Sequence, residues 1–576
     1  MKMTGGEILL RCLKAENIPY VYGIVGGRFM SFIRAISLDP TVEYIGTRHE
    51  AAAAHMAAAT FHSTGRLGVC IGDMGPGGGN LISGVASAFN NNIPMLALTS
   101  NNPNRGTYPF NGMFMDMDFV NLFKPITKWN AHVKDPFRIP ELVRWAVKEA
   151  LLGRPGPVHL DLAADALTAT VEIDEALFVS EPRHYRVTDR SRTTAGPIEA
   201  AAELLVNAKK PLLLAGGGVI ASEAVPEFRE LAHLLRAPAT ATQMGLGAVS
   251  SQESSYIGQG GIIAGHAVVR AMQEADVVLA VGCRFSSWIW DNDGPLVKGK
   301  NGQKLIHIDI DPSVIGRLNR IEVGLLGDAK AVLIDLLQSI RCRDLSSIPT
   351  ERQWTRSLMD TYRSYRQQLM NHNEHEDMVM HPAELAQEIG RHLPEDALVV
   401  FDGGHTTFWS NDFTPILKAR TRFHDPGMSQ LGFGTPYAHA IKMLYPDRPV
   451  FNIIGDGSFG FTLQELDTAR RYGIRVIHII HNNGSWGIQR NSQKEMFQYE
   501  YGVDLTGTNY AEIAKAFGCY GERISSLEHV LPAIHRAEES GLPAVIDVQV
   551  RFEPHPALPY LGAMSTAGLP KAMAKS

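Results

Sequence analysis

Three features that often narrow a protein's function are missing from this sequence: a long apolar run, a secretory leader and an excess of positive charge. No apolar segment approaches the roughly 18 residues that cross a bilayer, and the first residues lack the charged, apolar and small-residue regions of a signal peptide. The formal net charge is −6 over 576 residues, and Lys and Arg are scattered, without the basic patch that binds nucleic acid. We therefore expect a soluble, cytoplasmic protein with neither a membrane nor a nucleic acid as partner.

Cysteine is also scarce. The chain has five cysteines, which are widely spaced and include no C-x-x-C pair. This pattern argues against a disulfide framework and a zinc site, and it favours reduced and mostly buried thiols.

What the sequence does contain is a regular alternation of apolar runs and alanine-rich helical stretches such as Glu50–Thr60 and Thr462–Arg471. Short apolar runs bounded by glycine fit strands that are buried on both faces, and their alternation with helices predicts parallel sheets wrapped by helices. The fold class is therefore α/β, with doubly wound parallel sheets. The predicted strands are Leu67–Ile71, Met95–Ser100, Val158–Leu162, Pro211–Ala215, Val277–Val281, Leu305–Ile310, Leu398–Phe401, Val450–Ile454, Val476–Ile480 and Ala544–Val550.

The length exceeds what one hydrophobic core usually organises, and two connecting segments divide the chain. Asp174–Gly196 and Cys342–Met380 are polar, charged or proline-bearing, as domain connections usually are. The predicted domains are residues 1–180, 190–345 and 370–553, followed by a tail at 554–576. This tail is a loose terminus by default, and a lid over a site is the alternative.

The strongest local motif lies in the third block. The run Val450–Ile454 leads into Gly455-Asp456-Gly457, and after a helix the next strand ends at Asn482-Asn483. Adjacent parallel strands place Asp456 and Asn483 at one sheet edge, where α/β sheets bind ligands and helix N-termini attract phosphate. Oxygen ligands of this kind, completed by phosphates, suit Mg²⁺.

This pair of motifs resembles the signature of thiamine-diphosphate enzymes. The resemblance implies that Mg²⁺ is bound by Asp456, the side chain of Asn483 and the backbone carbonyl of Ser485. It also implies a set of cofactor contacts in the third block, in which Gly457 and Ser458 bind the diphosphate and Leu431 is an apolar wedge that bends the cofactor. The complete set is Gly404, His405, Thr406, Ser429, Leu431, Gly457, Ser458, Asn483, Trp486 and Gly487.

A second motif is Arg48-His49-Glu50-Ala51-Ala52 in the first block, which resembles a pattern of the same family. There a glutamate protonates the cofactor's pyrimidine ring, so that the C2 carbanion can form, and the resemblance assigns this role to Glu50. Taken alone, Glu50 would be an acidic residue in a helix's first turn. Because the family's cofactor lies between these two domains of different subunits, the resemblance implies at least a homodimer, and a homotetramer is common among relatives.

The middle block carries a weaker signal. The segments Leu212–Gly218 and Ile306–Pro312 resemble the glycine turn and the acidic strand end of dinucleotide folds. Relatives use this domain for FAD, for ADP, for the adenine end of coenzyme A or for no ligand, and these alternatives stay open.

The whole chain resembles the branch that contains acetolactate synthase, benzaldehyde lyase, oxalyl-CoA decarboxylase and 2-hydroxyacyl-CoA lyase. Three positions depart from individual members: Arg28 stands where benzaldehyde lyase has its active-site histidine, and Phe114 where acetolactate synthase has a glutamine. Gln489–Glu495 lacks the tryptophan of the acetolactate synthase substrate loop. An aromatic near Phe114 is instead similar to the coenzyme A thioester branch.

The leading hypothesis is therefore a carbon–carbon lyase or carboligase of the 2-hydroxyacyl-CoA lyase or benzaldehyde lyase type, acting on a 2-hydroxyacyl-CoA, a 2-hydroxy ketone or a 2-oxo acid. Glu50, Phe114 and Glu495 are the catalytic candidates, although Glu495 also fits a solvated loop. One alternative is an acetolactate synthase or a 2-oxo acid decarboxylase, but Phe110–Val120 lacks the His-His pair of pyruvate decarboxylase. The second alternative is a noncatalytic homologue that only binds the cofactor.

Overall fold

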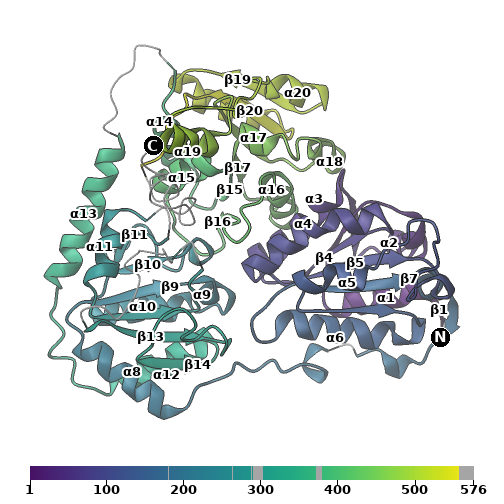
Figure 1. Cartoon of the computed structure of the whole chain (residues 1–576), viewed down its shortest axis with the longest axis horizontal. Helices are drawn as coiled ribbons and strands as arrows, with labels where there is room; N and C mark the ends of the chain where they lie inside the picture. The colour runs from purple at the N-terminus through teal and green to yellow at the C-terminus, as the bar shows by residue number, and fades with distance from the viewer. Residues whose placement is uncertain (180, 262–263, 287–288, 290–301, 371–378, 557–576) are drawn as a thin grey trace.

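Three parallel sheets of six strands each organise the chain (Figure 1). The computed structural model describes residues 1–179, 181–261, 264–286, 289, 302–370 and 379–556. One sheet lies in each of three lobes: an N-terminal domain in purple and blue, a central domain in teal and a C-terminal domain in green and yellow. The prediction of three α/β domains with parallel sheets is confirmed.

The N-terminal sheet has the strand order β3-β2-β4-β5-β7-β6, and all its pairs are parallel. A short antiparallel pair, β1 with β8, lies apart from it. The strands are β1 (Lys2–Thr4), β2 (Tyr20–Gly23), β3 (Glu43–Gly46), β4 (Gly68–Gly72), β5 (Met95–Asn101), β6 (Trp129–Val133), β7 (Val158–Ala163) and β8 (Thr170–Glu172). The helices are α1 (Gly5–Ala15), α2 (Met30–Ser37), α3 (Glu50–Thr64), α4 (Pro76–Asn91), α5 (Phe119–Phe123), α6 (Ile139–Leu151) and α7 (Ala164–Thr168).

The central sheet has the order β11-β10-β9-β12-β13-β14 and is also parallel throughout. Its strands are β9 (Pro211–Ala215), β10 (Ala239–Ala241), β11 (Tyr256–Gln259), β12 (Val277–Val281), β13 (Lys304–Asp309) and β14 (Val323–Leu326). The helices of this part of the chain are α8 (Ala195–Asn207), α9 (Gly217–Ala221), α10 (Val225–Leu235), α11 (His266–Glu274), α12 (Ala329–Arg341) and α13 (Gln353–Met370).

The C-terminal sheet repeats the parallel arrangement in the order β16-β15-β17-β18-β20-β19. Its strands are β15 (Leu398–Asp402), β16 (Arg422–Phe423), β17 (Val450–Gly455), β18 (Ile477–Asn482), β19 (Tyr520–Ile524) and β20 (Ala544–Gln549). Its helices are α14 (Pro382–His392), α15 (Gly404–Phe413), α16 (Gly434–Leu444), α17 (Asp456–Phe459), α18 (Glu465–Tyr472), α19 (Gly487–Phe497), α20 (Tyr510–Ala516) and α21 (Val530–Glu539).

Each sheet is apolar on both faces because helices cover both. In β4, Val69 and Ile71 pack into one hydrophobic core of the N-terminal domain, while Cys70 between them packs into another. This second core also contains Phe433 and Tyr437 of the C-terminal domain. The first and third domains therefore share a core through α3, α4 and α16, and this contact fixes how their sheets lie relative to each other.

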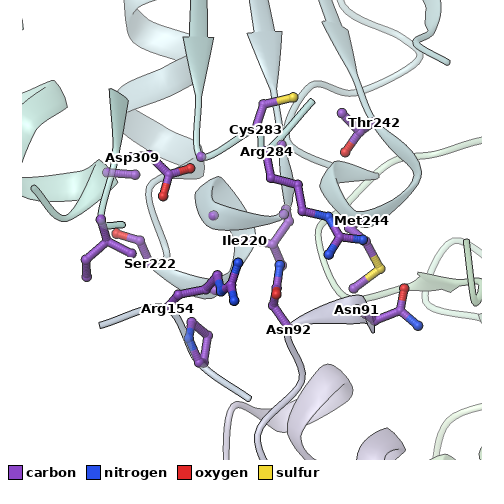
Figure 2. A pocket seen from close by; sticks show the side chains of 18 of the residues that line it. Asn91, Asn92, Arg154, Ile220, Ser222, Thr242, Met244, Cys283, Arg284 and Asp309 are labelled. Atoms are coloured by element: carbon purple, nitrogen blue, oxygen red, sulfur yellow. The ribbon is translucent and has the colours of Figure 1, made fainter. Parts of the chain in front are cut away.

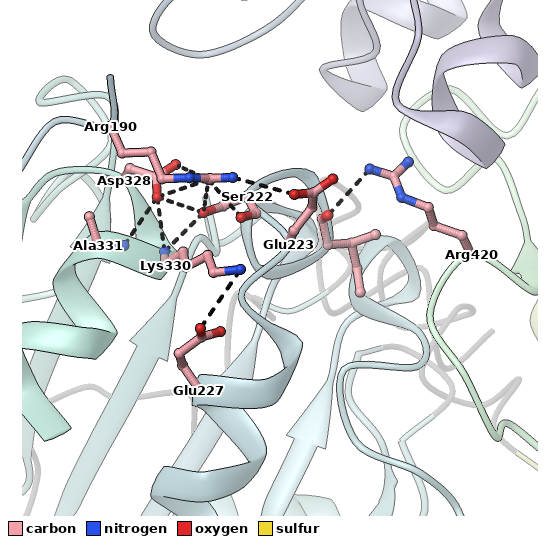
Figure 3. Close-up of polar contacts among 9 residues, drawn as sticks. Arg190, Ser222, Glu223, Glu227, Asp328, Lys330, Ala331 and Arg420 are labelled. Atoms are coloured by element: carbon pink, nitrogen blue, oxygen red, sulfur yellow. Dashed lines mark hydrogen bonds and ion pairs between the residues drawn. The ribbon is translucent and has the colours of Figure 1, made fainter. Parts of the chain in front are cut away.

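Polar contacts tie the central domain to its neighbours (Figure 3). Arg190, in the segment before α8, donates to both carboxylate oxygens of Asp328 at 3.1 Å, and Asp328 caps α12. Arg420 of the C-terminal domain donates to the carbonyl oxygen of Ile220 at 3.4 Å and to those of Phe61 and His62 in the N-terminal domain. Its guanidinium thus contacts all three domains. No helix in the described part of the chain is both long and apolar enough to span a bilayer.

Candidate functional site

Asp456 and Asn483 emerge side by side from the C-terminal sheet. The strands β17 and β18 that precede them are parallel neighbours, with Gly455 paired to His481. The Asp456 carboxylate accepts the backbone N–H of Gly484 at 2.9 Å, directly after Asn483. The two segments of the sequence motif therefore meet at the carboxyl edge of the sheet.

The oxygens at this edge suit a hard cation. Asp456 is 4% exposed, and burial raises the pKa of its carboxyl to about 6 against the opposing effect of the N–H groups of Gly457 and Gly484. The Asn483 side-chain oxygen accepts the N–H and the hydroxyl of Ser485 at 3.0 and 3.1 Å. A divalent ion bound by oxygens would compensate the buried carboxylate charge.

Glycines let three segments approach one another closely around this edge. A Cβ on Gly457 would lie 2.6 Å from the Trp486 ring, and a Cβ on Gly404 would lie 1.9 Å from Ile488 Cδ1. Gly403 has φ +94°, which favours glycine, and its Cβ position lies 3.0 Å from the Ser458 hydroxyl. The turn before α15, the start of α17 and the start of α19 therefore lie close together, and backbone N–H groups at helix starts suit a diphosphate.

His405 and Thr406 lie in the first turn of α15, and both are buried. Burial lowers the pKa of His405 to about 4, so its imidazole is neutral at physiological pH. Its ring contacts the position that a Cβ on Gly487 would occupy, at 2.6 Å. His405 is therefore a packed, uncharged side chain next to the start of α19.

Leu431 and Ser429 lie on the loop between β16 and α16. Ser429 is exposed in a left-handed conformation with φ 52°, and Leu431 is half-buried. Gly432 follows with φ +87°, and a Cβ there would lie 2.5 Å from Phe461 Cβ. This tight turn fixes the direction in which Leu431 leaves the loop.

Glu50 is the first residue of α3 and follows β3 at the carboxyl edge of the N-terminal sheet. It is 7% exposed and accepts the Asn80 side-chain N–H at 2.9 Å. One carboxylate oxygen lies 3.2 Å from the position of a Cβ on Gly77 in α4. Neither Asn80 nor Gly77 was singled out from the sequence as a neighbour of Glu50, because no local pattern links α4 to α3.

Glu50 and Asp456 do not touch each other within the described chain. The side chain of Glu50 accepts from Asn80, whereas Asp456 contacts Gly484 and Tyr510. The two halves of the predicted site therefore stand on separate domains.

The two weaker catalytic candidates also lie apart. Phe114 is 73% exposed on the loop between β5 and α5. Glu495 is exposed near the end of α19 and accepts the Asn491 side-chain N–H at 3.0 Å. In the part of the chain that the structure describes, neither residue makes a hydrogen bond to Asp456. The lid predicted for residues 554–576 falls almost entirely outside the described residues, which end at 556.

A cavity of about 270 Å³ lies where the three domains meet, at the carboxyl ends of the central strands (Figure 2). Its lining includes the glycine turn after β9, where a Cβ on Gly216 would lie 2.1 Å from the Gly282 carbonyl oxygen. Asp309, at the end of β13, faces it together with the guanidinium groups of Arg154 and Arg284. Burial and the charge of Arg154 lower the pKa of Arg284. Arg154 is also ion-paired with Asp311 at 3.5 Å, so the cavity contains both basic and acidic side chains.

The family models match all three domains. The N-terminal TPP binding domain of thiamine pyrophosphate enzymes matches residues 3–122, the central domain 198–336, and the C-terminal TPP binding domain 402–548. The chain belongs to this family and is a thiamine-diphosphate-dependent enzyme that makes or breaks carbon–carbon bonds. This confirms the resemblance inferred from the motifs.

Full-length relatives narrow the class to the acetolactate synthase group. The probable acetolactate synthase large subunit of Methanocaldococcus jannaschii is 32% identical over 570 residues, which cover 97% of this chain and 93% of the relative. The acetolactate synthase isozyme 2 large subunit of Escherichia coli is 31% identical over 552 residues, covering 95% and 96%. The similarity therefore extends over all three domains.

Proposed function

We propose that this chain is a thiamine-diphosphate- and Mg²⁺-dependent carboligase that decarboxylates one 2-oxo acid and joins its acyl unit to the carbonyl carbon of a second substrate. The observation that carries the proposal is the similarity, over 95% and 97% of this chain, to proteins named acetolactate synthase. When bound, the cofactor supplies the nucleophilic carbon. In the net reaction the bond to the donor carboxylate breaks and CO₂ leaves, a new C–C bond forms, and the acceptor's carbonyl oxygen gains one proton.

The chain's own residues have separate tasks in this proposal. Asp456 and Asn483 hold the metal with their side-chain oxygens, and Ser485 adds its carbonyl. Gly457 and Ser458 hold the diphosphate at the start of α17. Glu50 holds a proton at the pyrimidine ring of the cofactor.

The separation of Glu50 from Asp456 in one chain supports a dimer as the minimum active unit. Each site would then combine the Glu50 edge of one subunit with the Asp456 edge of its partner. A homotetramer, built from two such dimers, is the assembly we propose.

The sequence motifs favour a 2-hydroxyacyl-CoA or benzaldehyde-type lyase, whereas the names of the relatives favour the alternative, an acetolactate synthase. Support for the lyase comes from Phe114, whose 73% exposure leaves an aromatic ring free to line a substrate site. The two reactions share the cofactor, so only the substrate separates them.

Separate incubations of the holoenzyme with pyruvate, benzoin and 2-hydroxyisobutyryl-CoA distinguish these functions. We expect CO₂ and acetolactate from pyruvate, measured by coupled assay and mass spectrometry. Formation of acetone and formyl-CoA from the thioester, with no product from pyruvate, would replace the carboligase by the lyase.

We also propose that the cavity between the domains binds a nucleotide, either FAD, ADP or the adenine end of coenzyme A. Arg154 and Arg284 supply charge for a diphosphate, and Asp309 supplies an acceptor for a ribose hydroxyl. The glycine turn at Gly216 lets backbone approach the ligand closely. These features support a nucleotide without selecting one.

Mass spectrometry of the small molecules released from heat-denatured protein identifies the occupant, and a flavin would also show in the visible spectrum. We expect Arg284→Met to reduce nucleotide content and Arg34→Met, an exposed control on α2, to leave it unchanged. Nucleotide-free wild-type protein that binds none of the three ligands in calorimetry would rule the proposal out.

A further inference from the structure

Arg28 lies at the same sheet edge as Glu50 and takes no part in the cofactor and metal contacts proposed above. It belongs to the short helical turn after β2, while Glu50 follows β3, and these two strands are parallel neighbours. The next strand, β4, leads to Asp73, whose carboxylate lies 2.0 Å from where a Cβ on Gly26 would be. Gly77 lies between Asp73 and Glu50, since a Cβ on Gly77 would lie 3.6 Å from Asp73 Cβ and 3.2 Å from a Glu50 carboxylate oxygen. Arg28 is thus part of the surface around Glu50.

The Arg28 guanidinium is oriented by neutral groups. Its Nε donates to the Met74 sulfur at 3.3 Å, and one terminal nitrogen donates to the Asn102 side-chain oxygen at 3.2 Å. Asn102 is fully buried, and its own N–H groups donate to Asp116 at 2.7 Å and to the Phe114 carbonyl at 2.9 Å. The amide of Asn102 is therefore locked, and it holds the guanidinium in one direction.

Among the described residues, the positive charge of Arg28 has no ion-pair partner. Within the described residues no carboxylate lies within ion-pairing distance of it, and a thioether and an amide accept only two of its five N–H groups. The side chain is half-buried, so water screens it only in part. A fixed fork of unused donors on a ligand-binding edge matches a carboxylate.

Which carboxylate it binds follows from the proposed function, on which this inference rests. A donor 2-oxo acid loses its carboxylate as neutral CO₂, and an ion pair to that group would stabilise the substrate more than the transition state. An acceptor 2-oxo acid keeps its carboxylate in the product. We propose that Arg28 binds the carboxylate of the acceptor and thereby selects a 2-oxo acid over a neutral aldehyde.

Acceptor competition in the holoenzyme tests this selection. With pyruvate as donor, we expect Arg28→Met to lower kcat/KM for 2-oxobutyrate as acceptor roughly 10- to 100-fold and to leave that for propanal within about twofold. Arg28→Lys keeps the charge without the fork, so it should recover part of the loss. Equal losses for both acceptors would mean a general disturbance of the site and would overturn the proposal.

Binding provides a readout that does not need turnover. Oxamate resembles a 2-oxo acid but does not decarboxylate, so calorimetry with enzyme saturated in thiamine diphosphate and Mg²⁺ measures carboxylate recognition alone. We expect Arg28→Met to weaken oxamate roughly 10- to 100-fold while the cofactor's affinity stays unchanged, and Arg34→Met to match the wild type. If methionine disturbs cofactor binding, Arg28→Lys alone carries the comparison, with weaker oxamate binding expected.

The outcomes separate this inference from the proposed function. Unchanged oxamate affinity in the Arg28 variants, or no oxamate binding by the wild type, would refute the role of Arg28. Arg28-dependent binding in an enzyme that forms no product from pyruvate would refute the carboligase and leave the anion site standing.

Discussion

The buried carboxylate of Glu465 accepts the backbone N–H of Arg48 with both oxygens, at 3.1 and 3.2 Å. Glu465 begins α18 of the C-terminal domain, and Arg48 lies two residues before Glu50 in the N-terminal domain. The hydroxyl of Thr468 donates a further hydrogen bond to Glu465 at 2.7 Å. One side chain therefore connects the segment that follows Asp456 to the turn that presents Glu50.

Replacing Glu465 by Gln should alter how stability depends on pH. Burial raises the pKa of Glu465 from 4.5 to about 7, so between these pH values the folded protein holds a proton that the unfolded chain has released. The contribution of this group to the free energy of unfolding is therefore largest below pH 4.5. It decreases as the pH rises to about 7, by at most about 3 kcal/mol. Glutamine does not titrate, so the unfolding midpoint of Glu465→Gln should vary less between pH 5 and 7.

Thermal unfolding followed by circular dichroism at several pH values measures this difference. Glu528→Gln, on an exposed residue of the same domain, is the matched control and should follow the wild type. An identical pH dependence in Glu465→Gln and wild type would show that this carboxyl does not titrate in the window.

Glu50→Gln should separate cofactor binding from turnover. Glutamine has nearly the same shape and can still accept the hydrogen bond from Asn80, so the affinity for thiamine diphosphate should change little. It cannot hold the proton that the pyrimidine needs, and turnover should fall about 10²- to 10⁴-fold. Calorimetry and a product assay measure the two quantities, and Glu43→Gln, at the exposed first residue of β3, is the control. Unimpaired turnover in Glu50→Gln would remove this residue from the mechanism.

The sequence located the central strands of each sheet because these are apolar on both faces. Pro211–Ala215 and Val277–Val281 have the predicted ends, and both are fully buried. Edge strands were harder to recognise. Tyr520–Ile524, at the edge of the C-terminal sheet, mixes buried and half-buried residues and contains two charges, so no apolar run marks it. The helix expected from Thr462 begins only at Glu465, because Thr462 lies in a turn and donates to the Gly432 carbonyl.

The same distinction applies to the candidate site: residues in local motifs could be predicted from the sequence, and residues that act through contacts between domains could not. Asp456 and Asn483 were found because each follows a strand in a recognisable motif, and β17 and β18 are neighbours. Glu465 looks like an ordinary helical acid in the sequence, and only the packing of α18 against the N-terminal domain reveals its partner. Contacts between domains leave no local periodicity, so a single sequence does not contain them in readable form. The roles of the individual site residues remain predictions.

Asp456→Ala should reduce the affinity for thiamine diphosphate through loss of the metal. The variant removes the carboxylate at the sheet edge, and we expect Mg²⁺-supported cofactor binding to weaken more than about tenfold. Asn483→Ala should act in the same direction. Ser485→Ala should have the smallest effect of the three, because alanine retains the backbone carbonyl and loses only the hydroxyl that donates to the Asn483 oxygen. Calorimetry with and without a chelator checks all three. A loss in Ser485→Ala as large as in Asp456→Ala would contradict this division of ligands.

Gly84→Ala should displace the helix that carries Glu50. A Cβ on Gly84 of α4 would lie 2.6 Å from Ala54 Cβ and 3.0 Å from the Ala51 carbonyl oxygen of α3, where neither helix has room to yield. Overpacking of this kind costs about 1 to 3 kcal/mol, so the unfolding midpoint should fall. Because α3 begins at Glu50, turnover should fall further than cofactor binding. Gly79→Ala on the same helix meets no atom within 4 Å and should be neutral or slightly stabilising. Equal behaviour of the two alanine variants would show that α3 and α4 do not cross at this glycine.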